Sequence, residues 1–236
     1  MPFQKQFNPM EMEISNYQEF RSYLTEVELK NSPEELFTEG DFSLLYEGRR
    51  VAVVGSRKVS PQGIKRAQVI TKKLVEKGII VVSGLAQGVD TVAHTTAIRE
   101  QGKTIAVLGT PLDKVYPKEN KELLDLIKKD HLAISQFPLN YPSRPANFPI
   151  RNRTMALISD ATIIIEASEK SGTRHQGWEA LRLGRSVLLL ENIVSDSSLT
   201  WPKEMLDYGA QVLTRENFDS ILSDLPFVTS KSDYAF

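Results

Sequence analysis

Short apolar runs recur along the chain, each followed by small or polar residues and then by a segment with helical spacing. In the clearest case, residues 51–54 form an apolar run that ends at Gly55. Ser60 and Pro61 then fit the N-cap and the first position of a helix. Strands that are apolar on both faces and alternate with helices predict a parallel sheet covered on both sides. The strands predicted in this way are residues 51–54, 79–82, 104–109, 132–135, 161–166 and 186–190.

The predicted fold class is α/β, a Rossmann-like doubly wound, mostly parallel sheet with helices on both faces. Residues 1–45 are expected to form a short helical N-terminal extension, and residues 46–236 the Rossmann-like domain with a short acidic C-terminal tail. Within the extension, one helix is expected around residues 10–29. A second is expected to start at the capping box Ser32-Pro33-Glu34-Glu35 and to stop at Gly40. Further helices are predicted over residues 61–77, around 93–97, over 119–129 and over 154–159.

The composition limits the classes of protein to consider. A chain of 236 residues with 41% hydrophobic content can bury one sizeable core. It has no cysteine, which excludes disulfides and thiol nucleophiles and is compatible with a reducing cytoplasm. No apolar run approaches the length of a membrane span. We therefore expect a soluble cytoplasmic protein that does not insert into a membrane.

Charge is distributed unevenly although the net charge is only -1. Residues 1–50 carry 5 Lys and Arg against 10 Asp and Glu, residues 51–190 carry 21 against 12, and residues 191–236 carry 3 against 8. The central segment is basic and both ends are acidic. A site for a polyanion is therefore expected in the middle of the chain, although several of its lysines are typical of solvated helix faces.

Glycine-containing turns follow several of the predicted strands, and ligands of such sheets bind at the carboxyl ends of the strands. Backbone NH groups of the first turn and the positive end of the helix after it would hold an anion. The planar guanidinium of Arg57 would add a charged fork. The predicted phosphate-binding residues are Gly55, Ser56, Arg57, Ser83, Gly84, Gly88, Arg151, Asn152, Arg153, Ser171, Gly172, Thr173 and Arg174.

Arg151 and Arg153 are expected in or just before the first turn of the helix predicted over residues 154–159. Positive side chains there oppose the helix dipole. A bound phosphate would remove the conflict, and such local rule-breaking tends to mark functional sites. The alternative is that both arginines pair with acids elsewhere in the chain.

Metal and nucleophilic chemistry find no support in the sequence. The three histidines, His94, His131 and His175, show no metal-ligand spacing, so no metal and no cofactor is predicted. His94 is expected to be packed in a helix and hydrogen-bonded, whereas His175 lies in one of the predicted site turns. No serine has a convincing base nearby in the sequence, so a hydrolase triad is unsupported.

Several spaced motifs together resemble the DprA/Smf family of DNA-processing proteins. They include Gly55-Ser56-Arg57, residues 83–90, Tyr116-Pro117 and residues 148–153, and the resemblance covers roughly residues 44–210. It implies a Rossmann-like domain that binds single-stranded DNA without chemistry, forms a homodimer and hands DNA to a RecA-type recombinase during natural transformation. The chain departs from the family after Ser171-Gly172, where polar residues replace the usual apolar ones and the Thr-Ala pair.

That departure keeps a second hypothesis open. The family shares a superfamily with LOG-type phosphoribohydrolases, and Gly172-Thr173 followed by Glu179 is loosely similar to their nucleotide-binding motif. Glu179 would then stabilise positive charge developing on a ribose, with Arg151 or Arg153 holding the phosphate. Glu179 is otherwise a surface helix residue beside Arg182 or Arg185, which we favour. A non-catalytic nucleotide sensor, for example in defence, is a third interpretation.

On the preferred interpretation, the chain binds successive phosphates of single-stranded DNA, and its affinity falls steeply with salt. Phe148 or Phe137 would stack a base, unless either side chain belongs to the core. Replacing Arg151 and Arg153 with alanine is expected to weaken DNA binding by well over tenfold, on the order of the loss of two phosphate contacts, with the fold intact.

Overall fold

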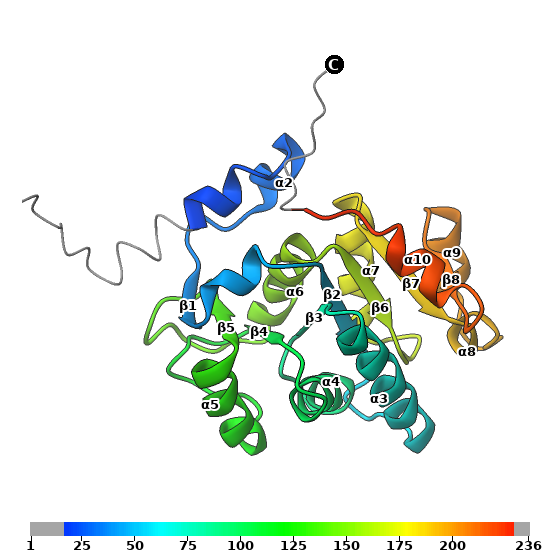
Figure 1. Cartoon of the computed structure of the whole chain (residues 1–236), viewed down its shortest axis with the longest axis horizontal. Coiled ribbons are helices and arrows are strands. Elements are labelled where there is room, and N and C mark those ends of the chain that lie inside the picture. The colour runs from blue at the N-terminus through cyan, green and yellow to red at the C-terminus, as the bar shows by residue number, and fades with distance from the viewer. Residues whose placement is uncertain (1–16, 229–236) are drawn as a thin grey trace, which may run out of the picture.

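The computed structural model describes residues 17–228, and within them one sheet of eight strands organises the fold (Figure 1). The strands lie in the order β1-β5-β4-β3-β2-β6-β7-β8. All neighbours are parallel except β1, which is antiparallel to β5. The predicted fold class is confirmed. The strands are β1 (Phe37–Gly40), β2 (Arg50–Val54), β3 (Ile80–Ser83), β4 (Thr104–Leu108), β5 (Leu132–Ser135), β6 (Ala161–Ile164), β7 (Ser186–Leu190) and β8 (Gln211–Leu213).

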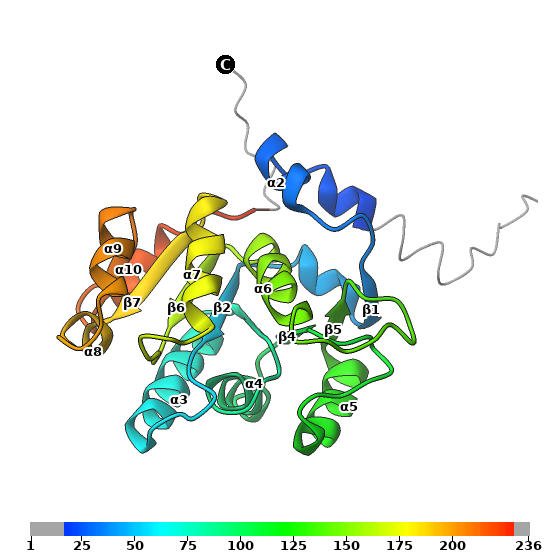
Figure 2. The ribbon, with the colours of Figure 1, turned by 180° about the vertical axis from the view of Figure 1, so that it is seen from behind.

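Helices cover both faces of this sheet, as Figure 2 also shows from behind. Residues 17–21 are helical, and no helix within residues 17–228 has the length and hydrophobicity needed to span a bilayer. The other helices are α2 (Glu26–Asn31), α3 (Pro61–Glu76), α4 (Val89–Arg99), α5 (Lys121–Asp130), α6 (Asn147–Ile158), α7 (Thr173–Arg182), α8 (Glu191–Val194), α9 (Trp201–Asp207) and α10 (Phe218–Ser223), with short 3₁₀ turns η1 (Phe42–Leu45) and η2 (Lys118–Asn120).

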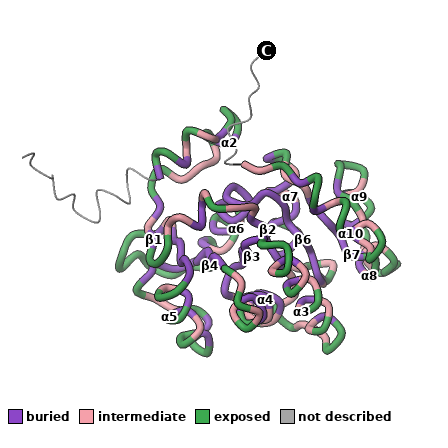
Figure 3. The backbone as a smooth tube through the Cα atoms, in the orientation of Figure 1, coloured by how far each residue is buried: buried purple, intermediate pink, exposed green. Residues whose placement is uncertain are grey.

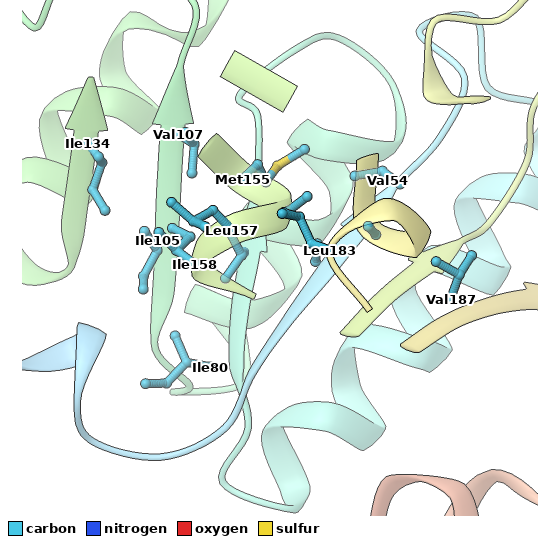
Figure 4. Close-up of a cluster of buried hydrophobic side chains, with 14 of the residues drawn as sticks. Val54, Ile80, Ile105, Val107, Ile134, Met155, Leu157, Ile158, Leu183 and Val187 are labelled. Carbon is cyan, nitrogen blue, oxygen red and sulfur yellow. The ribbon is translucent and has the colours of Figure 1, made fainter. Parts of the chain in front are cut away.

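Alternating strand residues divide the core between the two faces. Val51 and Val53 of β2 pack in a cluster with α3, α4 and α10, whereas Ala52 and Val54 pack with α6, α7 and α9. Every residue of β2 is buried, as the burial-coloured trace in Figure 3 shows for the central strands. Figure 4 shows Met155 of α6 in the second cluster. The apolar runs of the sequence are therefore strands buried on both sides.

The N-terminal segment differs from the predicted one. No helix starts at Ser32-Pro33, because residues 37–40 are strand β1 at the sheet edge, paired with β5. The capping box instead lies at Thr25 and Glu28, whose side chains and backbone NH groups bond reciprocally. A helix of two turns is marginal alone, and edge pairing satisfies the same backbone groups. The part of the long helix expected at residues 10–16 lies outside the described residues.

Helix α6 also begins earlier than expected, at Asn147 rather than at Thr154. The helix runs through Pro149, because this proline occupies the third helical position, where a backbone NH has no partner within the helix. Arg151 and Arg153 therefore lie in the second turn, and the predicted conflict with the helix dipole in the first turn was wrong.

The order in which strands are added to the sheet changes direction after β5. Strands β2 to β5 are added in one direction, and α6 then returns the chain so that β6 pairs with the other side of β2. Ser56, just after β2, donates its backbone NH to the carbonyl of Glu166, just after β6, at 2.7 Å. The carboxyl ends of β2 and β6 form the crevice where ligands of such sheets bind.

Histidine 94 gives the fold a testable pH dependence. The side chain is fully buried, and Thr104 Oγ1, which donates to the Val81 carbonyl at 2.8 Å, lies 2.7 Å from His94 Nδ1. His94 was expected to be packed and hydrogen-bonded, and this is confirmed. Burial lowers the pKa of His94 to about 3, and positive charge at His131 and Arg151 contributes.

Between about pH 6.5 and 3, the unfolded chain binds a proton at this histidine that the folded chain does not. We therefore expect His94 to make stability fall with falling pH, by up to about 1.4 kcal/mol per pH unit. Urea unfolding of the wild type and of His94→Asn between pH 7 and pH 5 measures this. The variant should show the shallower pH dependence, and parallel curves would contradict the assignment.

Candidate functional site

A cavity of about 780 Å³ opens at the carboxyl ends of β2 and β6. Its wall combines the turn after β2, the start of α6 and the turn before α7. Eight of the thirteen predicted site residues line it, and five do not. The lining ones are Gly55, Ser56, Arg57, Arg151, Asn152, Ser171, Gly172 and Thr173; Ser83, Gly84, Gly88, Arg153 and Arg174 are absent from the wall.

The turn after β2 is held by Glu166 rather than by a ligand. Ser60 donates its backbone NH to Glu166 Oε1 at 2.9 Å and its hydroxyl to Glu166 Oε2 at 2.5 Å. Ser60 Oγ in turn accepts the NH of Gly63 and caps α3. The positive end of α3 thus already faces a carboxylate from the protein itself, which corrects the expectation that this helix end would hold the bound anion.

Arg57 is the part of that turn that faces outward. Its side chain is exposed, and its guanidinium lies 5.4 Å from the centre of the Phe148 ring in a cation–π contact. The Phe148 ring lies 5.4 Å from the ring of Tyr116, and all three side chains line the cavity. By contrast, Phe137 is only 4% exposed and is not among the lining residues, so only Phe148 is placed to meet a base there.

The turn after β3 packs against other parts of the protein and does not line the cavity with Ser83, Gly84 or Gly88. Ser83 is fully buried and donates its hydroxyl to the Val53 carbonyl at 2.7 Å. A Cβ on Gly84 would lie 1.6 Å from Arg151 Nη1, and one on Gly88 would lie 2.2 Å from the Ser56 carbonyl oxygen. The close approach that these two glycines permit is therefore to protein atoms and not to a ligand.

Arg151 is a buried structural cation, only 5% exposed. Its Nη1 donates to the carbonyls of Gly84 and Val107, the latter at 3.0 Å. Asp90 nearby accepts the backbone NH of Gly84 at 3.2 Å. Burial raises the pKa of Asp90, and the Arg151 charge opposes that rise. Alanine at position 151 would leave the Gly84 and Val107 carbonyls without this donor. We therefore expect the change to destabilise the fold, contrary to the expectation from the sequence.

Arg153 and Arg174 each lie beside a glutamate on the surface. Arg153 Nε lies 3.4 Å from Glu179 Oε2, and Arg174 pairs with Glu169 at 3.7 Å. Glu179 is also paired with Arg182, as the surface-helix interpretation expected, whereas Arg185 pairs with Glu28 instead. Of the residues of the hydrolase alternative, Glu179 and Arg153 do not line the cavity, whereas Arg151 does.

The turn before α7 is the open side of the cavity. Ser171 Oγ accepts the backbone NH of Thr173 at 3.2 Å, and no atom lies within 4 Å of a Cβ placed on Gly172. The first turn of α7 contains no acidic residue. His175 and Gln176 follow and also line the cavity. This wall offers a ligand close contact with backbone and hydroxyl groups.

Unpaired positive charge surrounds the cavity. Arg57 and Lys58 line it. Three further exposed cations that form no ion pair among the described residues lie within two residues of its wall, namely Lys118, Arg144 and Lys170. None of these five forms an ion pair with any residue of the described chain. The one acidic residue of the wall is the buried Asp90. The opening is therefore suited to an anionic ligand.

Sequence reasoning missed several lining residues. Lys58 adjoins a predicted arginine, and Tyr116 lies in one of the recognised motifs, so both carried a usable signal. Asp90 likewise lies in the recognised motif of residues 83–90, whereas Gln176 is placed by tertiary packing alone. Among residues 17–228, no three His, Cys, Asp or Glu side chains cluster in a way that could hold a metal ion.

Comparison with known proteins matches most of the chain to one family. The model of a protein family described as DNA recombination-mediator protein A matches residues 12–226. The chain is 38% identical over 187 residues to DNA processing protein DprA of Streptococcus pneumoniae, covering 79% of this chain and 66% of that protein. It is 32% identical over 194 residues to DprA of Bacillus subtilis, covering 82% and 65%. The chain thus spans just under two thirds of the length of these relatives.

A solved structure extends the comparison to three dimensions. DNA processing protein A from Helicobacter pylori, described as having a unique single-stranded DNA binding mode, is similar with a TM-score of 0.75 and 27% identity. The match covers 86% of this chain and 94% of the Helicobacter pylori chain.

The packing of Gly84 against Arg151 gives a prediction with an internal control. Gly84→Ala should destabilise the protein by about 2 kcal/mol or more, because the new methyl group overlaps a buried guanidinium. Gly172→Ala should change stability by less than about 0.5 kcal/mol, because its Cβ would enter open space at a φ of -62°. Urea unfolding of both variants measures the difference, and equal stabilities would contradict the packing.

Proposed function

Because the chain belongs to the DprA/Smf family of DNA-processing proteins, we propose that it binds single-stranded DNA in the cavity between β2 and β6. The observation that carries this proposal is the pairing of unneutralised cations, Arg57 and Lys58, with an aromatic ring, Phe148, on the same wall. Phosphates and bases are the two groups that such a wall recognises. The similar Helicobacter pylori protein is described as binding single-stranded DNA.

Charged side chains, backbone groups and a hydroxyl group bind the phosphates. Arg57 offers a planar fork that fits a phosphate, and Lys58 beside it adds a second charge. Gly172 and the hydroxyl of Thr173, on the opposite wall, contact the next phosphate group or its sugar. Because these contacts release counterions, affinity falls with salt by a slope of about 0.7 per phosphate on a logarithmic scale.

The base stacks on Phe148, whose ring contacts the guanidinium groups of Arg57 and Arg151 and the ring of Tyr116. A ring fixed in this way loses little conformational freedom on binding. Stacking on an aromatic face is open to every base, so binding is largely independent of sequence. The protein acts without covalent chemistry, since the wall presents no nucleophile paired with a base.

The wider role follows the family. We include in the proposal a homodimer, a RecA-type recombinase as partner and action in DNA uptake or recombination in the cytoplasm. The supporting observation is the match over residues 12–226 to a family described as a recombination mediator. Because the chain spans just under two thirds of its curated relatives, each of these roles needs its own test.

Arg57 and Arg153 provide a matched pair for the central test. Arg57→Ala should weaken binding of labelled oligothymidylate by about tenfold or more. The substitution removes a cation that has no ion-pair partner in the described chain, and with it both the phosphate contact and the cation–π contact to Phe148. Arg153→Ala should change affinity by less than about twofold, because Arg153 lies outside the cavity wall and beside the carboxylate of Glu179. Fluorescence anisotropy at two salt concentrations measures both.

AMP serves as competitor in the same experiment. Salt-sensitive oligothymidylate binding that AMP barely disturbs supports the proposal. Wild-type protein that does not bind the oligonucleotide, or an Arg57→Ala variant that binds it as wild type does, contradicts it. Ready displacement by AMP would identify the cavity as a site for a small nucleotide instead.

A further inference from the structure

Beside the cavity, two loops from neighbouring strands present a second aromatic and basic surface. The loop after β4 carries Tyr116, which is 54% exposed, and the loop after β5 carries Leu139 and Tyr141, which are 61% and 38% exposed. Arg144 lies in the same loop, exposed and without an ion-pair partner in the described chain. We call Tyr116, Leu139, Tyr141 and Arg144 the loop platform. Strands β4 and β5, which precede these loops, are adjacent (Figure 2).

The loop platform is a built surface rather than a loose loop. Lys114 Nζ donates to the Tyr141 carbonyl at 3.0 Å and joins the two loops. The Tyr141 ring stacks on the buried Phe137 ring, with centroids 5.3 Å apart and planes 30° from parallel. Asn147 Nδ2 donates to the Pro142 carbonyl at 3.2 Å, which closes the loop onto the start of α6.

Prolines stiffen the same segment. Pro138, Pro142, Pro145 and Pro149 all fall within residues 138–149, and each fixes one backbone φ angle. A segment restricted in this way loses less conformational entropy when it binds a ligand. Its side chains are therefore presented before binding, as a stacking surface requires.

The platform continues directly from the cavity. Tyr116 belongs to both surfaces, since it lines the cavity and contacts Phe148. The other side of the opening, residues 166–174, contains no aromatic residue. A polymer with a base on Phe148 therefore finds stacking partners for its next bases in one direction, across Tyr116 toward Tyr141.

We propose that the loop platform binds the nucleotides next to the one held in the cavity, with bases against Tyr116 and Tyr141 and a phosphate on Arg144. This inference rests on the proposed binding of single-stranded DNA and gives the strand a direction from the cavity toward β5. Charge complementarity identifies the occupant, because the platform combines exposed rings with an unpaired cation, and the loop that carries Leu139, Tyr141 and Arg144 has no acidic residue between positions 131 and 146.

Oligonucleotides of two lengths test the loop platform and the cavity independently. Labelled twelve-residue oligothymidylate reaches both surfaces, whereas unlabelled thymidine trinucleotide, used as a competitor, fills the cavity. Tyr141→Ala should weaken binding of the long strand at least about fivefold, as loss of one stacked base does, and leave competition by the trinucleotide unchanged. Tyr141→Phe should retain wild-type affinity because the ring remains.

Arg144→Ala and Tyr208→Ala complete the design. Arg144→Ala should lower the logarithmic salt slope for the long strand by about 0.7, the value for one phosphate contact. Tyr208, which is 74% exposed and packs edge-on against Trp178, is an aromatic control away from the platform. Its replacement should change neither the affinity for the long strand nor the affinity for the trinucleotide. Thermal unfolding confirms that each variant is folded.

The outcomes distinguish this inference from the proposed function. If the wild type binds neither oligonucleotide, the proposed function fails. If the wild type binds both while Tyr141→Ala and Arg144→Ala bind the long strand with unchanged affinity and salt slope, only the platform is overturned. A change in sedimentation of Tyr141→Ala, without a change in DNA affinity, would show a contact between protein chains and would equally overturn it.

Discussion

The buried guanidinium of Arg151 is the interaction on which the site depends. It binds the carbonyls of Gly84 and Val107, at the ends of two adjacent strands, and lies opposite the buried Asp90. Each of these groups would be costly to bury alone. The guanidinium donates to both carbonyls, and its charge opposes the cost of burying the Asp90 carboxylate. The floor of the cavity is therefore fixed before any ligand binds. An arginine that the sequence marked as a phosphate ligand is buried, and it fixes one wall of the cavity proposed to bind phosphate.

A division of charge follows from this arrangement. Glu166 occupies the positive end of α3, and Arg153 and Arg174 each lie beside a glutamate on the surface. Arg57 and Lys58 keep their charge toward the opening. Because isolated charge next to an aromatic ring attracts phosphate and base together, the geometry favours a strand of nucleic acid over a neutral or apolar ligand.

Much of this could be predicted from the sequence, and the failures have physical causes. The strands at residues 51–54, 132–135 and 186–190 were recognisable because burial on both faces requires continuous apolar runs. The turns around Gly55 and Gly172 were recognisable from their glycines. Sequence did not show that Ser83 and Gly84 face protein, because long-range contacts decide this. Nor did it show that α6 begins at Asn147, before Pro149, or that residues 37–40 form an edge strand.

The central claim is that a single DNA strand lies in the cavity between β2 and β6. Photo-crosslinking of oligothymidylate carrying 4-thiothymidine, followed by mass spectrometry of the linked peptides, tests it most directly. We expect crosslinks on the peptides that contain Tyr116, Phe148 and His175, which line the cavity. Crosslinks confined to the outer faces of α3 and α5, with none on these peptides, would contradict the claim.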